Sequence, residues 1–129
     1  MKFTVDKRER YLIFELQESR LDTGIAPNLK TEFVLLNNEG FRNMIVDLSA
    51  VSFVDSSGLG AILIGNRLCK NARGTFVLTG VQEAVMKLIK ISQLDEILMI
   101  AGSEEEANDY ILMEEVQREI EGVNGQDEA

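Results

Sequence analysis

The sequence predicts an α/β domain built on a mixed β-sheet of about five strands, with four to five helices. Short apolar runs rich in Val, Ile and Leu alternate along the chain with longer segments of helical period. The chain opens with two strand-like runs joined by a short charged turn, so at least one strand pair is expected to be antiparallel. With 129 residues, 45% of them hydrophobic, and one proline, the chain suits a single domain with a regular core.

The N-terminal third is expected to form two strands and then a helix. Residues 2–6 and 10–16 have strand character, and the charged turn "DKRER" joins them. "SRLDTGIAP" is expected to be a loop, and Pro27 suits the first turn of the following helix, where its missing N–H costs nothing. The helix is marked by apolar residues at helical spacing, namely Leu29, Phe33 and Leu36. The turn residues from Asn37 to Gly40 predict its end.

The middle of the chain is expected to alternate between strands and helices. "RNMIVDLSAV" (42–51) has the β-branched, unalternating character of a strand buried on both faces. A helix is predicted over 57–71, and a strand over 74–80 that glycines bound on both sides. Apolar positions at i, i+3 and i+4 then predict an amphipathic helix over 81–91.

The C-terminal part is expected to hold a final strand, a final helix and a tail. The strand is predicted over 96–100 and the helix over 103–120, where Ser103 and Glu106 have the spacing of a capping box. The last residues have little apolar surface to pack, so 119–129 is expected to be a frayed acidic tail. We therefore place the domain at 1–118.

Composition excludes several classes of function. The net charge of −9 comes from residues 101–129, which hold ten acidic side chains and one Arg, so the chain lacks the basic surface that nucleic-acid binding requires. The acidic C-terminus is most simply a solvated face. The absence of histidine removes Ser-His-Asp and Cys-His catalysis, and with a single cysteine it makes a zinc site improbable. We expect no enzyme activity, no cofactor and no metal.

The same composition bears on where the protein works. The apolar runs are too short to span a bilayer, and the charged N-terminus lacks the apolar core of a signal peptide. The only cysteine, Cys69, lies in a helical run and is best explained as a packing residue. The expectation is therefore a cytoplasmic protein without membrane insertion.

The segment "FVDSSGLG" (53–60) is where function is expected, because it joins a strand to a helix at the carboxyl edge of the sheet. Ser56 or Ser57 can act as the helix N-cap. A nucleophile elbow would need glycines on both sides of the serine, and a phosphate-binding loop would need a Lys-Ser or Lys-Thr pair, and neither is present. Alternatively, a serine receives a phosphate, since the positive end of the helix dipole tolerates the added charge. Physical chemistry alone leaves the cap and the phosphoacceptor open.

Resemblance favours the phosphoacceptor. "VSFVDSSGLGAIL" (51–63) closely resembles the signature of STAS-domain proteins, in particular bacterial anti-sigma factor antagonists, and the likeness extends over about 1–118. It implies that Ser56, directly after the aspartate, is phosphorylated. "RLDTGIAPNLK" is similar to a family segment in which an aspartate, here Asp22, contributes to kinase docking; the alternative is that Asp22 only stabilises its loop or caps the next helix. The resemblance implies a partner-binding surface made of Asp22, Thr23, Asp55, Ser57, Gly58 and Leu59.

The neighbours of the serines also have simpler explanations. Asp55 can serve only to accept hydrogen bonds from loop amides, and Gly58 and Gly60 can serve close backbone packing. Two residues depart from the family pattern: Arg20 stands where an acidic residue is common, and Arg73 replaces the first of two glycines in a turn. The first departure bears on which partner docks.

The resemblance implies a regulatory role rather than catalysis. The unphosphorylated protein would bind an anti-sigma factor that is also a serine kinase, and so release a sigma factor; phosphorylation would end this binding, and a serine phosphatase would restore it. The alternative within the same fold is a STAS scaffold or transport-accessory subunit with an unmodified serine. A small-ligand or nucleotide-binding domain is a third possibility, which the missing histidine and phosphate-loop lysine disfavour.

Overall fold

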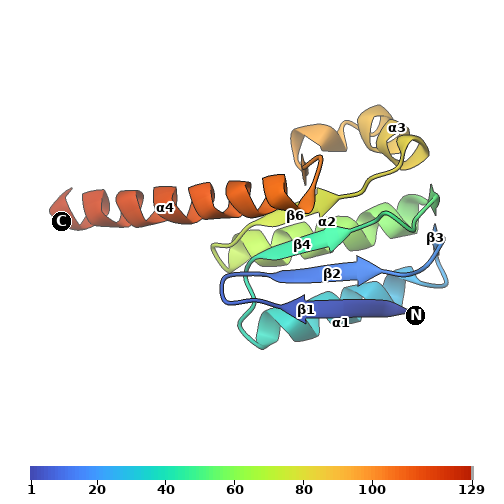
Figure 1. The fold of residues 1–129 in the computed structure, drawn as a ribbon, viewed down its shortest axis with the longest axis horizontal. Coiled ribbons are helices and arrows are strands. Elements are labelled where there is room, and N and C mark those ends of the chain that lie inside the picture. Colours follow the sequence, from blue (N-terminus) through green and yellow to red (C-terminus); the bar gives the residue numbers. More distant parts are fainter. Residues whose placement is uncertain (129) are drawn as a thin grey trace.

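The computed structural model contains a five-stranded mixed sheet that has helices on both faces (Figure 1). It describes the backbone of residues 1–128 and the side chains of residues 1–122. The strand order is β1-β2-β4-β6-β7, where β1 and β2 are antiparallel and every other neighbouring pair is parallel. The strands are β1 (Phe3–Lys7), β2 (Leu12–Leu16), β4 (Met44–Asp47), β6 (Phe76–Thr79) and β7 (Met99–Ile100).

Four α-helices and one short 3₁₀ helix connect or follow these strands. They are α1 (Ala26–Asn38), α2 (Ser56–Asn71), α3 (Glu83–Ile91), η1 (Leu94–Glu96) and α4 (Glu104–Glu128). The predicted start and end of α1 are confirmed, since Pro27 lies in its first turn and Gly40 adopts a left-handed φ of 107° just after its end. The α/β fold with a mixed five-stranded sheet is therefore as predicted.

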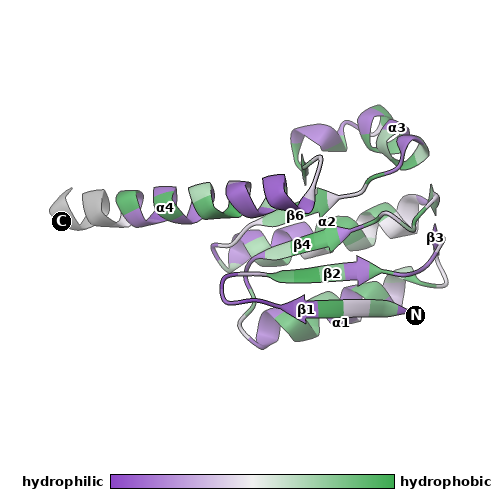
Figure 2. Ribbon diagram, viewed as in Figure 1, coloured by the Kyte–Doolittle hydropathy of each residue, from purple (hydrophilic) through white to green (hydrophobic). Residues whose placement is uncertain are grey.

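The main core lies between the sheet and the pair α1 and α2. Alternate residues of each strand point into it, as the period of two requires, and the helices contribute apolar residues such as Leu29 and Ile62. Phe33 of α1 packs edge-on against Phe14 and Phe76 of the sheet, with ring centroids 5.3 and 5.8 Å apart. In Figure 2 β2 and β4 are green over most of their length, which marks their hydrophobic residues.

The opposite face of the sheet is covered by the first part of α4. Ala107 and Ile111 of α4 pack there against Ile45 and Val77. The strands β4 and β6 are thus buried on both faces, which explains why 42–51 and 74–80 show no alternation of apolar and polar residues.

Two further short strands were not predicted from the sequence. Arg20–Leu21 (β3) and Phe53–Val54 (β5) form a separate two-stranded parallel sheet at the edge of the fold. Each has only two residues, too few for a periodic pattern to be recognised. The strand expected over 42–51 is correspondingly shorter, and the one expected over 96–100 begins at Met99, because η1 occupies part of that range.

The last helix is longer than predicted. Its start has the expected capping box in altered form: the Ser103 hydroxyl accepts the N–H of Glu106 at 3.1 Å, while the Glu106 carboxylate accepts the N–H of Gly102 at 2.8 Å. We expected a frayed tail over 119–129, but the helix runs to Glu128, and residue 129 lies outside the described chain. The domain boundary at 118 stays a prediction. No helix in the described chain has the length and apolar character needed to cross a membrane.

Candidate functional site

The small parallel sheet brings the two predicted functional segments together. Arg20 lies opposite Phe53 and Leu21 lies opposite Val54, so "DTG" after β3 and "DSSG" after β5 leave the same edge. The Asp55 N–H continues the pairing by donating to the Leu21 carbonyl at 3.3 Å. This pairing joins residues that are 33 positions apart in the sequence. It places the two segments side by side, which the sequence alone could not establish.

The N-cap of α2 is Asp55, and neither serine has that role. Asp55 has extended backbone angles, and its carboxylate accepts the Gly58 N–H at 2.9 Å. The pKa of this carboxyl is lowered from its usual value, chiefly by the Gly58 N–H and further by the Thr23 hydroxyl. The prediction that Ser56 or Ser57 caps the helix is therefore wrong, because an aspartate one residue earlier already satisfies the first-turn amide.

The two serines differ in their surroundings. Ser56 is the first residue of α2 and is exposed, and its hydroxyl has no hydrogen-bond partner within the described part of the chain. Ser57 is half-buried, and its hydroxyl lies 3.3 Å from the Thr23 hydroxyl. Ser56 is thus the serine that another molecule can reach without breaking an internal contact.

Thr23 connects the two segments, whereas Asp22 shapes its own loop. The Thr23 hydroxyl donates to the Asp55 carboxylate at 3.3 Å. The Asp22 carboxylate accepts the N–H of Gly24 at 3.0 Å, and its carbonyl accepts the N–H groups of the next turn. The N-cap of α1 is Ile25, so Asp22 stabilises the loop without capping the helix.

The glycines and Leu59 lie below this surface. A Cβ on Gly58 would collide with the Leu21 carbonyl oxygen, so the expected close packing at Gly58 is confirmed. The same expectation is wrong for Gly60, whose Cβ would meet open space. Leu59 is only 7% exposed, and Gly58 is buried, so both hold the start of α2 in place beneath the exposed residues. Their roles in partner binding, like those of the other predicted residues, stay predictions.

One feature of this surface was not predicted from the sequence. The Arg20 guanidinium lies 4.0 Å from the centre of the Phe53 ring, and its Nε is 3.4 Å from the Asp22 carboxylate. Phe53 is 40% exposed, so part of its ring faces the solvent. One indication of this contact was present in the sequence, namely that Arg20 departs from the family pattern. The contact itself could not be predicted, because it depends on the pairing of two-residue strands.

Other features of the described residues lie away from Ser56. A surface hollow lined by Asn66, Lys70 and Arg118 lies at the other end of α2 and does not include Ser56. Cys69 is buried, and desolvation raises the pKa of its thiol to about 12, which agrees with the predicted packing role.

Comparisons with known proteins agree with this architecture. A family model described as "STAS domain" matches residues 2–107. A relative described as "Putative anti-sigma factor antagonist BtrV", from Bordetella bronchiseptica, is 29% identical over 83% of this chain and 91% of its own. An "Anti-sigma-B factor antagonist" from Bacillus subtilis is 29% identical over 66% of this chain and 77% of its own. Among solved structures, the anti-sigma factor antagonist SpoIIAA in its unphosphorylated form has a TM-score of 0.72 at 25% identity, covering 85% of this chain and 96% of its own.

Proposed function

Because the chain belongs to the STAS domain family, we propose that it is an anti-sigma factor antagonist that phosphorylation of Ser56 switches off. In its unphosphorylated form it binds an anti-sigma factor and frees the sigma factor that this partner holds. The description of its relatives as anti-sigma factor antagonists supports this assignment. The proposal places the protein in the cytoplasm and gives it no catalytic step of its own.

The observation that carries the proposal is the availability of the Ser56 hydroxyl. Asp55 has taken over the capping of α2, so the Ser56 hydroxyl has no structural role that a modification would disturb. Its exposure at the first helical position also places it beside the positive end of the α2 dipole. A phosphate there would add about −1.5 to −2 charges and three acceptor oxygens without unfolding the helix.

The chemistry belongs to the partner. We propose that the anti-sigma factor is also a serine kinase: the Ser56 oxygen attacks the γ-phosphorus of ATP, ADP leaves, and a base on the kinase takes the hydroxyl proton. A serine phosphatase hydrolyses the phosphoester and restores the hydroxyl. SpoIIAA is also known in a phosphorylated form, and this chain resembles that structure with a TM-score of 0.66 at 25% identity.

The switch works by changing a small contact surface. Around Ser56 the exposed surface combines polar groups with the exposed Phe53, and the loop residues Asp22 and Thr23 border it. A partner that closes over a neutral hydroxyl would have to desolvate a dianion after phosphorylation, which is unfavourable without a compensating cation. The phosphorylated protein therefore dissociates from a partner selected for the hydroxyl form.

The test is phosphopeptide mass spectrometry on the endogenous protein across growth and stress conditions. Strains carrying Ser56→Ala or Ser57→Ala are matched controls, because the two serines are neighbours that differ in exposure. We expect a condition-dependent phosphate that disappears in Ser56→Ala and persists in Ser57→Ala. A peptide that is well covered and unmodified under every condition would contradict the proposal and favour a scaffold or transport-accessory role.

A further inference from the structure

Four exposed apolar side chains line one side of α4. Leu112, Met113, Val116 and Ile120, here called the α4 stripe, have exposed fractions of 42%, 69%, 45% and 56%. At 3.6 residues per turn they fall within an arc of roughly 100°. Figure 2 shows hydrophobic segments recurring along α4 beyond the body of the domain.

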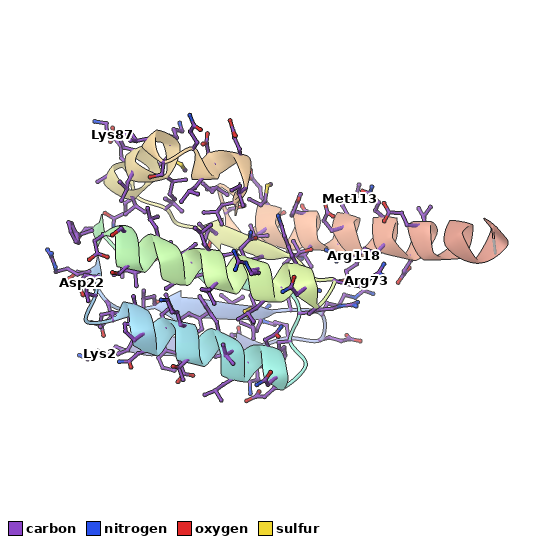
Figure 3. The ribbon with its side chains drawn as sticks, turned by 180° about the vertical axis from the view of Figure 1, so that it is seen from behind. Lys2, Asp22, Arg73, Lys87, Met113 and Arg118 are labelled. Atoms are coloured by element: carbon purple, nitrogen blue, oxygen red, sulfur yellow. The ribbon has the colours of Figure 1, made fainter. Side chains whose placement is uncertain are left out.

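The α4 stripe lies on the side of the helix opposite the one that packs on the sheet. Ala107 and Ile111 mark the packed side, where they are 0% and 1% exposed. Arg118 also lies on this side: it donates to the Gly74 carbonyl at 2.8 Å and to the Thr75 hydroxyl at 2.6 Å. In Figure 3 Met113 is on the side of α4 away from Arg73, whereas Arg118 faces it. The domain therefore leaves the α4 stripe uncovered.

Among the residues whose side chains are described, the part of α4 after Arg118 makes few contacts with its own domain. In the described part of the chain, Arg118 makes the last hydrogen bonds from α4 to the rest of the domain, at Gly74 and Thr75 just before β6, and Ile120 lies beyond it. A short helical segment without tertiary contacts is only marginally stable in water. Docking of the α4 stripe into a groove would stabilise this end, and anchors spaced by three and four residues suit that mode of binding.

The charge around the α4 stripe defines its occupant. Residues 104–121 carry eight acidic side chains and one Arg, a balance of −7. A second copy would bring two such helices together against their mutual repulsion, and anionic membrane surfaces would repel the helix as well. A partner surface that is apolar and flanked by cationic side chains complements both the α4 stripe and the acidic charge around it.

We propose that the α4 stripe binds a protein partner that presents an apolar surface flanked by Lys and Arg. Figure 3 places Asp22, beside the Ser56 surface, at one end of the molecule, and Met113 on α4 well away from it. The two surfaces can consequently be occupied at the same time, and phosphorylation of Ser56 leaves the second contact intact. The protein is then an adaptor with one switchable and one constant binding face.

The test uses a defined probe and the full chain. The probe is a fluorescent 18-residue helical peptide of Leu and Lys with the Leu residues on one face, and the control peptide has Glu at every Lys position. Binding is measured by fluorescence anisotropy for the wild type and for Met113→Gln/Ile120→Gln. The matched control is Val34→Gln/Leu35→Gln, which changes residues of α1 that are 39% and 51% exposed. Gln is a good helix former, so circular dichroism should be equal for all three proteins.

We expect the wild type and the α1 control to bind the Lys peptide equally, the α4 variant to lose at least tenfold in affinity, and the Glu peptide not to bind. Salt should weaken the binding because the charges are exposed. Equal affinity in the α4 variant would mean that charge alone is recognised and would overturn the proposal. A dimer in analytical ultracentrifugation that the α4 substitutions abolish would also overturn it, since a second copy would then be the occupant.

Discussion

Replacing Gly58 by Ala tests how tightly the small parallel sheet is held against α2. The new Cβ would collide with the Leu21 carbonyl oxygen and would lie 2.8 Å from Leu21 Cγ and 2.9 Å from Val54 Cγ1. A backbone carbonyl cannot rotate away, so β3 must shift, and overpacking of this kind costs about 1–3 kcal/mol. The helix propensity of Ala returns up to about 1 kcal/mol. We expect the free energy of unfolding to fall by a net amount of up to about 2 kcal/mol.

Gly60→Ala is the matched control, because it adds the same methyl group two residues later in the same helix. Its Cβ meets open space, so only the propensity gain of up to about 1 kcal/mol applies. The propensity gain is common to both variants, so they should differ by the overpacking cost of about 1–3 kcal/mol in urea unfolding. Gly58→Ala should lie below the wild type and Gly60→Ala above it. If Gly58→Ala were as stable as Gly60→Ala, the close contact between α2 and β3 would be refuted.

Three further outcomes follow from the same structure. Asp55→Ala should be less stable than the wild type in urea unfolding, because the cap on the Gly58 N–H is removed. The pKa of Asp55 is lowered in the folded protein, so its contribution to stability is complete above the unfolded pKa and is lost as the pH falls through the folded pKa. The melting temperatures of Asp55→Ala and the wild type should therefore converge in acid. A difference that stays constant with pH would contradict this. Glu115→Gln should destabilise the protein by about 1–2 kcal/mol. Burial opposes the charge of the Glu115 carboxylate, but its contacts with Asn43, Arg42 and Arg118 outweigh burial and lower its pKa, and in the variant the two Arg charges lose their anionic partner. An unchanged urea midpoint would contradict this network. Cys69 should react with a thiol reagent only on unfolding, and rapid labelling of the native protein would show that it is accessible.

The elements with long periodic patterns could be predicted from the sequence. α1 was foreseen from its apolar spacing and its turn residues, and β4 from its unalternating apolar run. The pair β3 and β5 could not be foreseen, because two residues carry no period and their pairing depends on chain segments far apart in the sequence. The arrangement of the site was missed for the same reason, since it is this pairing that sets Thr23 beside Asp55 and Arg20 beside Phe53.

The N-cap of α2 shows a different kind of error. Asp is as favourable as Ser at an N-cap, and Asp55 stands directly before the two serines, so the signal was present but was assigned to the wrong residue. The end of α4 was missed because the acidic segment after Ile120 offers little to pack. The propensity of such a segment cannot reveal whether the helix continues without tertiary support.

The projection of α4 has a hydrodynamic consequence. A helix of 25 residues is about 37 Å long, while a domain of about 100 residues has a radius of gyration near 13 Å. Much of this rod extends past the sheet in Figure 1, so the molecule is elongated and diffuses more slowly than a sphere of equal mass. A single copy should elute early in gel filtration and imitate a larger assembly, and light scattering, which measures mass independently of shape, is the method that assigns its oligomeric state.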